Sequence, residues 1–200
     1  MEYKNAIFNE HKIGKTIDFQ IIEKFIEEKD QKDFISMMDS LESNDQLTII
    51  GDGRKVLINP SELNIKYFIK KYSNKVKELF PHLMIHQLLV GKYEKGASMV
   101  VHRDSDSHQQ CEDCEVSGVL YFNDNYVGGE IYFPNIGKQY LPSSGSIVLF
   151  GIHDTDYDHG VKTIESGVKY VMPMCFTNNK KYLNKEYDWD SLINKLKMPD

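Results

Sequence analysis

The sequence predicts an α+β fold in which helices come first and a β-sandwich follows. Apolar residues recur at helical spacing in the first third of the chain, up to about residue 82. From Leu83 onward, short apolar runs are separated by Gly, Pro, Asn and Asp, which is typical of strands joined by tight turns. No internal repeat or long linker divides the 200 residues, so we expect one domain. Its parts are residues 1–82 as mainly helical support, 83–177 as the β core and 178–200 as a C-terminal tail.

Two helical segments are expected early in the chain. Thr16 can cap a first helix, and the apolar positions that follow at helical spacing are Ile17, Ile21, Ile22, Phe25 and Ile26. A shorter amphipathic segment covers Phe34–Leu41. Both patterns predict helices that pack one apolar face on the β core.

A hairpin and a longer helix come next. Gln46–Ile50 and Lys55–Ile58 flank a Gly-Asp-Gly turn, which predicts a β-hairpin. Asn59 can cap the longer helix, with Pro60 in its first turn and Pro81 after its end. Its apolar stripe consists of Ile65, Phe68, Ile69, Tyr72, Val76, Leu79 and Phe80.

The remainder of the chain predicts short strands at regular spacing, as in a sandwich or barrel. The expected strands are Leu83–Val90, Ser98–Val101, Val116–Phe122, Glu130–Phe133, Ser146–Phe150, Gly160–Ile164 and Lys169–Thr177. A short helix over Trp189–Lys197 is expected to dock on the outside.

Composition excludes several classes of protein. The chain is 40% hydrophobic and 27% charged, which is ordinary for a globular protein. A net charge of −6 argues against a general binder of nucleic acid or of anionic membranes. There is no signal region and no apolar run of roughly 18 residues, so we expect an intracellular, cytoplasmic protein without a membrane span. The sequence gives no indication of an oligomeric state.

The cysteines do not form a disulfide framework, because there are only three of them. Cys111 and Cys114 are spaced as in zinc sites, and His108 lies nearby. No second pair completes four ligands, so we expect two reduced thiols in a loop.

A sparse set of residues in the second half can bind a metal. His102 and Asp104 follow a predicted strand and point to the same side, and His159 opens another strand. Two imidazoles and one carboxylate can occupy one face of an octahedral iron(II), which leaves three positions open. Taken alone, a histidine and an aspartate two residues apart also fit a solvated loop.

Three competing residues, His108, His153 and Lys162, lie close to the ends of this pattern. A lysine, Lys169, follows ten residues after His159 and can hold an anionic co-substrate. His153 lacks this lysine spacing and the following strand. Lys162 lies only three residues beyond His159, so Lys169 is preferred.

The surrounding segments occur in a specific order. They are Tyr93-Glu94-Lys95-Gly96, Val101-His102-Arg103-Asp104, Gly118-Val119-Leu120-Tyr121-Phe122-Asn123-Asp124, Gly128-Gly129-Glu130-Ile131-Tyr132-Phe133-Pro134, Pro142 to Phe150, His159-Gly160-Val161 and Gly167-Val168-Lys169-Tyr170. Together they resemble the iron(II)/2-oxoglutarate-dependent dioxygenases of the prolyl 4-hydroxylase type. The resemblance covers about Leu83–Thr177, and the helical first third fits it only loosely.

The resemblance implies a double-stranded β-helix (jelly-roll) core with N-terminal flanking helices. It implies that the metal ligands are His102, Asp104 and His159. Lys169 would pair with the distal carboxylate of 2-oxoglutarate, and Tyr121 would reach the same carboxylate or serve only as a core aromatic. Tyr93 would approach the metal-binding end of the co-substrate. Met99 stands where the family often has an aromatic residue, which softens that wall of the pocket.

The implied reaction uses Fe(II), 2-oxoglutarate, O₂ and ascorbate, and it couples decarboxylation to succinate and CO₂ with hydroxylation of a C–H bond. A carboxylate at Asp104 argues against a halogenase. The favoured substrate is a prolyl residue of a peptide or protein; the alternatives are a nucleobase or small metabolite, and a non-catalytic β-sandwich binding module. The polar segment Ser105–Glu115 is either a lid or a surface loop.

Overall fold

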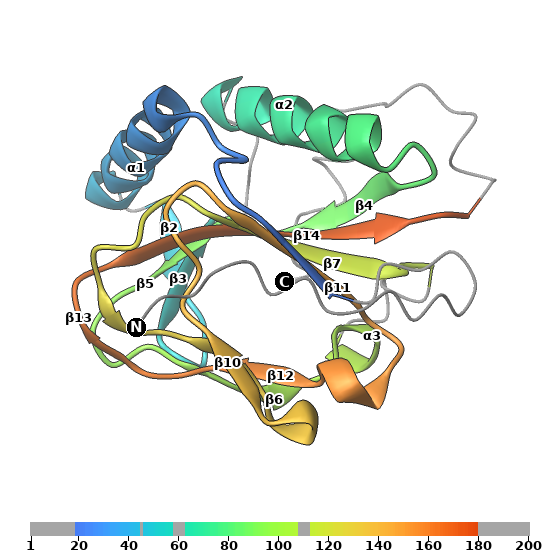
Figure 1. The fold of residues 1–200 in the computed structure, drawn as a ribbon. Helices are drawn as coiled ribbons and strands as arrows, with labels where there is room; N and C mark the ends of the chain where they lie inside the picture. Colours follow the sequence, from blue (N-terminus) through green and yellow to red (C-terminus); the bar gives the residue numbers. More distant parts are fainter. Residues whose placement is uncertain (1–18, 45, 58–62, 108–112, 180–200) are drawn as a thin grey trace.

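Two antiparallel β-sheets face each other, and two long helices cover the outer face of the larger sheet (Figure 1). The computed structural model describes residues 19–44, 46–57, 63–107 and 113–179. The helices are α1 (Glu28–Ser43) and α2 (Leu63–Leu79), and a single turn, α3 (Asp104–Ser107), lies near the smaller sheet (Figure 1).

The larger sheet is built from distant parts of the chain in the order β1-β11-β7-β14-β5-β3-β2, with β4 paired to β14. Its strands are β1 (Phe19–Ile22), β2 (Leu47–Ile49), β3 (Arg54–Leu57), β4 (Met84–Leu88), β5 (Gly91–Tyr93), β7 (Val116–Tyr121), β11 (Ile147–Gly151) and β14 (Lys169–Thr177). Apart from the hairpin of β2 and β3, neighbours in the sheet are not neighbours in sequence, so most of the sheet depends on contacts between distant segments.

The smaller sheet has the order β10-β9-β12-β6, and a separate ribbon pairs β13 with β8. These strands are β6 (Met99–His102), β8 (Val127–Gly128), β9 (Ile131–Phe133), β10 (Lys138–Tyr140), β12 (His159–Val161) and β13 (Ile164–Ser166). Two 3₁₀ turns, η1 (Pro134–Ile136) and η2 (Thr155–Tyr157), flank this sheet.

From β5 to β14 the chain alternates between the two sheets. β5, β7, β11 and β14 belong to the larger sheet, whereas β6, β9, β10 and β12 belong to the smaller one. This winding is the double-stranded β-helix that the sequence predicts, and the α+β class with N-terminal flanking helices is confirmed.

Two apolar clusters hold the layers together. In the outer cluster, between the helices and the larger sheet, Phe34 of α1 stacks on Phe122 with ring centroids 3.6 Å apart. The inner cluster lies between the sheets and includes Phe133 and Phe150, whose rings meet edge to face at 5.4 Å. Such burial is the main source of stability of the fold.

A buried polar contact joins the two helices. Asp30 of α1 is 2% exposed and accepts a hydrogen bond from the Tyr72 hydroxyl of α2 at 2.5 Å. The same carboxylate pairs with Lys71 at 2.8 Å. Because a buried charge is costly without partners, these contacts favour one relative placement of α1 and α2.

One prediction for the first third is wrong. Phe19–Ile22 is a strand rather than part of a helix, and it pairs antiparallel with β11 in the register Phe19↔Phe150 to Ile22↔Ile147. Apolar residues at 19, 21 and 22 fit either period, and pairing with an available sheet edge overrides the helical spacing. Thr16 and Ile17 lie outside the described residues.

Other boundaries differ more modestly from the prediction. The segment Phe34–Leu41 forms the middle and later part of α1, which begins earlier than predicted, at Glu28. The predicted strand Gly160–Ile164 is divided between β12 and β13. Strands β5, β8 and β10, of two or three residues each, were not predicted. The caps at Asn59 and Pro60 and the helix at Trp189–Lys197 fall outside the described residues. None of the helices in the described ranges is long and apolar enough to span a membrane.

Candidate metal and co-substrate site

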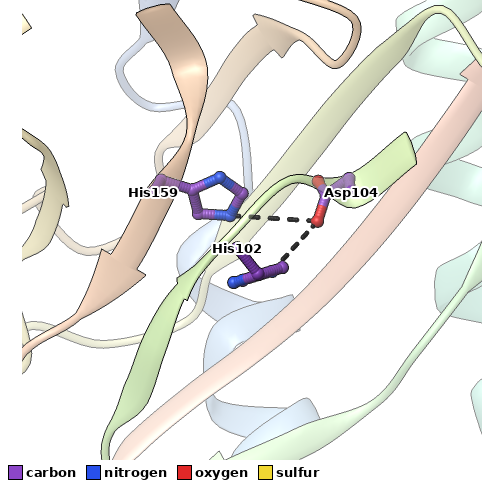
Figure 2. A group of neighbouring side chains, drawn as sticks. All are labelled: His102, Asp104 and His159. Carbon is purple, nitrogen blue, oxygen red and sulfur yellow. Dashed lines mark ion pairs between the residues drawn. The ribbon is translucent and has the colours of Figure 1, made fainter. Parts of the chain in front are cut away.

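Two imidazoles and a carboxylate meet where β6 and β12 lie side by side. The strands pair with His159 opposite His102, and the two ring centroids are 4.5 Å apart. Asp104 begins α3, just after β6, and its Oδ1 lies 3.2 Å from His102 Nε2 and 3.9 Å from His159 Nε2. One potential ligand atom from each residue lies within 4.8 Å of the other two, and Figure 2 shows both rings turned toward the carboxylate.

Backbone contacts set the orientation of both rings. His102 Nδ1 lies 3.0 Å from the carbonyl oxygen of Val100, and His159 Nδ1 lies 3.1 Å from that of Tyr157. A carbonyl oxygen can only accept a hydrogen bond, so each Nδ1 carries the proton. The lone pair of each neutral ring is therefore on Nε2, the atom that faces Asp104 and that a metal would bind.

The protonation states also suit a metal. Burial by itself raises the pKa of Asp104, but hydrogen bonds from His102 and Ser117 and the nearby His159 outweigh it and bring the pKa to about 2. Burial, with the neighbouring His102, lowers the pKa of His159. Burial also opposes protonation of His102, but the adjacent carboxylate raises its pKa overall. When His102 is protonated, the proton on its Nε2 is the positive partner of Asp104. A metal ion bound at Nε2 would replace this proton.

The donor set fits a first-row divalent ion. Two imidazole nitrogens and one carboxylate oxygen, grouped on one side, leave coordination positions open for other ligands. Among the residues that the structure describes, neither Cys114 nor His153 belongs to a group of three such side chains. Cys111 and His108 lie outside the described residues, so the four-ligand zinc reading gains no support.

A buried cation lies at the start of β14. Lys169 is 1% exposed, and its Nζ donates a hydrogen bond to the Gly129 carbonyl oxygen at 2.8 Å. The rings of Tyr93, Tyr121 and Tyr126 surround it, with centroids 5.2, 5.1 and 6.0 Å from Nζ. Burial lowers the pKa of Lys169 to about 7. Within the described ranges no carboxylate forms an ion pair with it, so the ammonium suits an anionic ligand.

Tyr93 connects this cation with the metal-binding residues. It pairs with Lys169 across β5 and β14, and its hydroxyl lies 3.8 Å from Met99 Sδ at the start of β6. The Arg54 guanidinium donates to the same hydroxyl at 3.4 Å. Burial raises the pKa of Tyr93. The positive charge of Arg54 lowers this pKa in part, and the negative charge of Asp104 raises it further. The hydroxyl therefore stays protonated and can donate to a ligand.

Tyr121 lies on the neighbouring strand β7, opposite Val171 of β14. It is 1% exposed, and burial raises its pKa well above the usual range, so its hydroxyl also remains a donor. Tyr93, Tyr121 and Lys169 thus come together as a set.

Two residues of this region are missing from the sequence-based prediction. Arg54 forms a two-point ion pair with Asp52 (Nε–Oδ1 2.7 Å, Nη2–Oδ2 2.6 Å). The positive charge of Arg54 also opposes protonation of His102. The Tyr126 hydroxyl is buried and has no hydrogen-bond partner among the residues that the structure describes. In the sequence, Arg54 is marked only as a cation beside a hairpin turn, and Tyr126 only as an aromatic residue inside a polar loop.

The competing residues lie elsewhere. The His153 side chain is 51% exposed, and its Nε2 lies 2.7 Å from the Cys114 carbonyl oxygen. Lys162 is exposed and donates to Gln139 at 2.5 Å. The proposed lid, Ser105–Glu115, includes residues 108–112, which lie outside the described residues.

Comparison with known proteins identifies the core. Residues 88–177 match the family model of the 2OG-Fe(II) oxygenase superfamily. This β core is similar to that superfamily. Fe(II) and 2-oxoglutarate are therefore its cofactors, as the sequence predicts, and the class of enzyme is a dioxygenase. No match to a curated protein was found.

Solved structures of prolyl hydroxylases share the oxygenase fold. The viral collagen prolyl hydroxylase of Paramecium bursaria Chlorella virus-1, in complex with 2-oxoglutarate, has a TM-score of 0.61 and 16% identity; the match covers 80% of this chain and 96% of that one. A Pseudomonas putida prolyl-4-hydroxylase gives 0.62 and 16%, with coverages of 80% and 91%. A Trichoplax adhaerens prolyl hydroxylase, bound to a hypoxia-inducible-factor peptide fragment, gives 0.60 and 20%, with coverages of 84% and 87%. At such identities the likeness shows the fold.

Proposed function

We propose that this oxygenase hydroxylates a prolyl residue of a peptide or protein. The observation that carries the proposal is the meeting of His102, Asp104 and His159 in the same core that buries the Lys169 ammonium. The peptide substrate is supported by the solved structures, whose names describe a collagen prolyl hydroxylase, a prolyl-4-hydroxylase and an enzyme bound to a peptide. Residues 1–200 would act as one oxygenase domain, with the helices as support.

Each site residue has a distinct role in this proposal. The iron ligands are His102, Asp104 and His159. Lys169 holds the distal carboxylate of 2-oxoglutarate with Tyr121 as a second donor, and Tyr93 contacts its metal-binding end. When bound, Fe(II) with 2-oxoglutarate and O₂ supplies the oxidation of a C–H bond, with succinate and CO₂ as the other products, and ascorbate serves as a reductant. The protein supplies orientation and charge.

The surroundings of His159 favour a rigid ligand. The side chain is 4% exposed, and the rings of Phe150 and Phe133 lie 4.7 and 5.8 Å from its own. These rings exclude water on one side, and the Nδ1 contact to the backbone prevents rotation of the imidazole. A ligand held in this way keeps its lone pair aimed at one point, which strengthens metal binding.

The metal assignment is tested by His102→Ala and His159→Ala. We expect each to abolish iron-dependent turnover of 2-oxoglutarate, measured as succinate, while the circular dichroism spectrum remains that of the folded protein. His153→Ala is the matched control, because this exposed histidine is outside the cluster, and it should retain wild-type turnover. Wild-type succinate production by either of the first two variants would refute the ligand assignment.

The substrate is tested by mass spectrometry of a peptide library incubated with enzyme, Fe(II), ascorbate and 2-oxoglutarate. We expect the mass of one oxygen atom to be added to prolyl peptides. Oligonucleotides and small metabolites form parallel arms of the experiment. Oxidation in one of those arms, without any peptide product, would contradict the peptide substrate and leave the reaction class intact.

A further inference from the structure

A two-point ion pair lies directly beside the metal-binding residues. Arg103 Nε donates to Asp158 Oδ1 at 2.7 Å, and Arg103 Nη2 donates to Asp158 Oδ2 at 3.0 Å. This fork geometry is more directional than a lysine contact, because the planar guanidinium and the carboxylate match at two points. The two side chains are 25% and 21% exposed, so the pair is partly shielded from solvent.

Its position in the chain links both parts of the candidate metal site. Arg103 stands between His102 and Asp104, and Asp158 immediately precedes His159. The pair thus connects the segment that carries two of the candidate ligands with the segment that carries the third. These segments are more than fifty residues apart in sequence, so no local geometry holds them together.

Backbone pairing at this point is limited. The ladder between β6 and β12 pairs His102 with His159 and Met99 with Val161, and its register shifts between these pairs. Asp104 lies beyond the ladder in the four-residue turn α3. The position of the carboxylate relative to His159 therefore depends on side-chain contacts in addition to the sheet.

The Asp158 end is itself held by the two 3₁₀ turns. Asn135 of η1 donates to the carbonyl oxygen of Thr155 in η2 at 2.5 Å and to Asp158 Oδ2 at 3.4 Å. Arg103 has a second acidic neighbour, Asp106, at 3.8 Å, but that side chain is 70% exposed and offers one distant contact. Asp158 is the partner with the geometry to fix the guanidinium.

We propose that Arg103 and Asp158 form a clamp that sets the separation of the iron ligands, so both are positioning residues that do not touch the metal. This inference rests on the proposed function, because it takes His102, Asp104 and His159 as the ligands. An ordinary surface ion pair contributes little to stability. Loss of the Arg103–Asp158 pair should instead lower metal affinity, because Asp104 is then free to move away from His159. Residues that support metal ligands from behind typically change metal affinity about 10–100-fold.

The test measures binding of Mn(II) in the presence of 2-oxoglutarate without oxygen, by titration calorimetry. Arg103→Gln and Asp158→Asn should each weaken Mn(II) binding about tenfold. Arg103→Lys should lie between Arg103→Gln and the wild type, since it keeps the charge and loses the second contact. The double exchange Arg103→Asp with Asp158→Arg should recover part of the loss. Asp106→Asn is the matched control and should bind like the wild type.

Urea unfolding of the same variants without metal separates positioning from stability. We expect a small loss of unfolding free energy alongside the large loss of Mn(II) affinity. Variants that are less stable but bind Mn(II) within twofold of the wild type would overturn the clamp and leave the proposed function standing. A wild-type protein that binds no Mn(II) would overturn both.

Discussion

In the absence of 2-oxoglutarate, replacement of Lys169 by methionine should raise the free energy of unfolding of the protein. The ammonium is 1% exposed, and burial lowers its pKa from the ordinary 10.5 to about 7. At about 1.4 kcal/mol per pKa unit, this difference corresponds to an upper limit of about 5 kcal/mol against the charged form in the folded state. Methionine keeps the apolar volume of the side chain and removes the charge. Apolar replacements of buried ion pairs have given gains of about 1–4 kcal/mol, and we expect a gain in this range for the single buried ammonium.

The gain in unfolding free energy from Lys169→Met should decrease as the pH rises. Below pH 7 the lysine is protonated in both the folded and the unfolded state, so the whole penalty is present. Between pH 7 and 10.5 the unfolded chain binds a proton that the folded protein lacks, so the stability of the wild type rises with pH. The advantage of Lys169→Met over the wild type should therefore shrink across this range.

The same substitution should weaken binding of 2-oxoglutarate. Loss of a charge-assisted hydrogen bond, about 1.5–3 kcal/mol, corresponds to an affinity that is about 10–150-fold lower. Wild-type affinity should itself fall as pH rises above 7, because binding the carboxylate then requires Lys169 to take up a proton.

The assay is urea unfolding at pH 6 and pH 9, with and without 2-oxoglutarate and Mn(II), in the absence of oxygen. Lys162→Met is the control, since this exposed lysine makes only a surface contact and should change neither quantity. The reasoning is refuted if Lys169→Met is less stable than the wild type at pH 6 and still gains the full stabilisation by 2-oxoglutarate.

Two further substitutions test the core and the co-substrate pocket. Phe34→Ala should lower the unfolding free energy by about 3–5 kcal/mol, because it removes a fully buried ring that stacks on Phe122; a loss below 1 kcal/mol in urea unfolding would contradict this role. Tyr121→Phe should raise the KM for 2-oxoglutarate about 2–12-fold while kcat changes little, since a neutral hydrogen bond contributes about 0.5–1.5 kcal/mol. An unchanged KM would make Tyr121 a core aromatic only.

Local patterns in the sequence predict the two long helices, α1 in part and α2 closely, and they predict the family. The stripe from Ile65 to Phe80 repeats every three to four residues, and such a period depends only on neighbours along the chain, so α2 is found where expected. The ordered segments between Leu83 and Thr177 predict the oxygenase family, which the family match confirms. The roles of individual site residues stay predictions, although the structure brings the predicted residues together.

What the sequence by itself determined is therefore the helix α2, the hairpin of β2 and β3, the chemical types of the site residues and the family. Only the tertiary structure decided that Phe19–Ile22 is a strand, that Tyr93 lies opposite Lys169 and that Arg103 meets Asp158. The physical reason is common to all three. Each depends on pairing between segments far apart in the chain, and the register of that pairing is set by packing of the whole core, which no local period encodes.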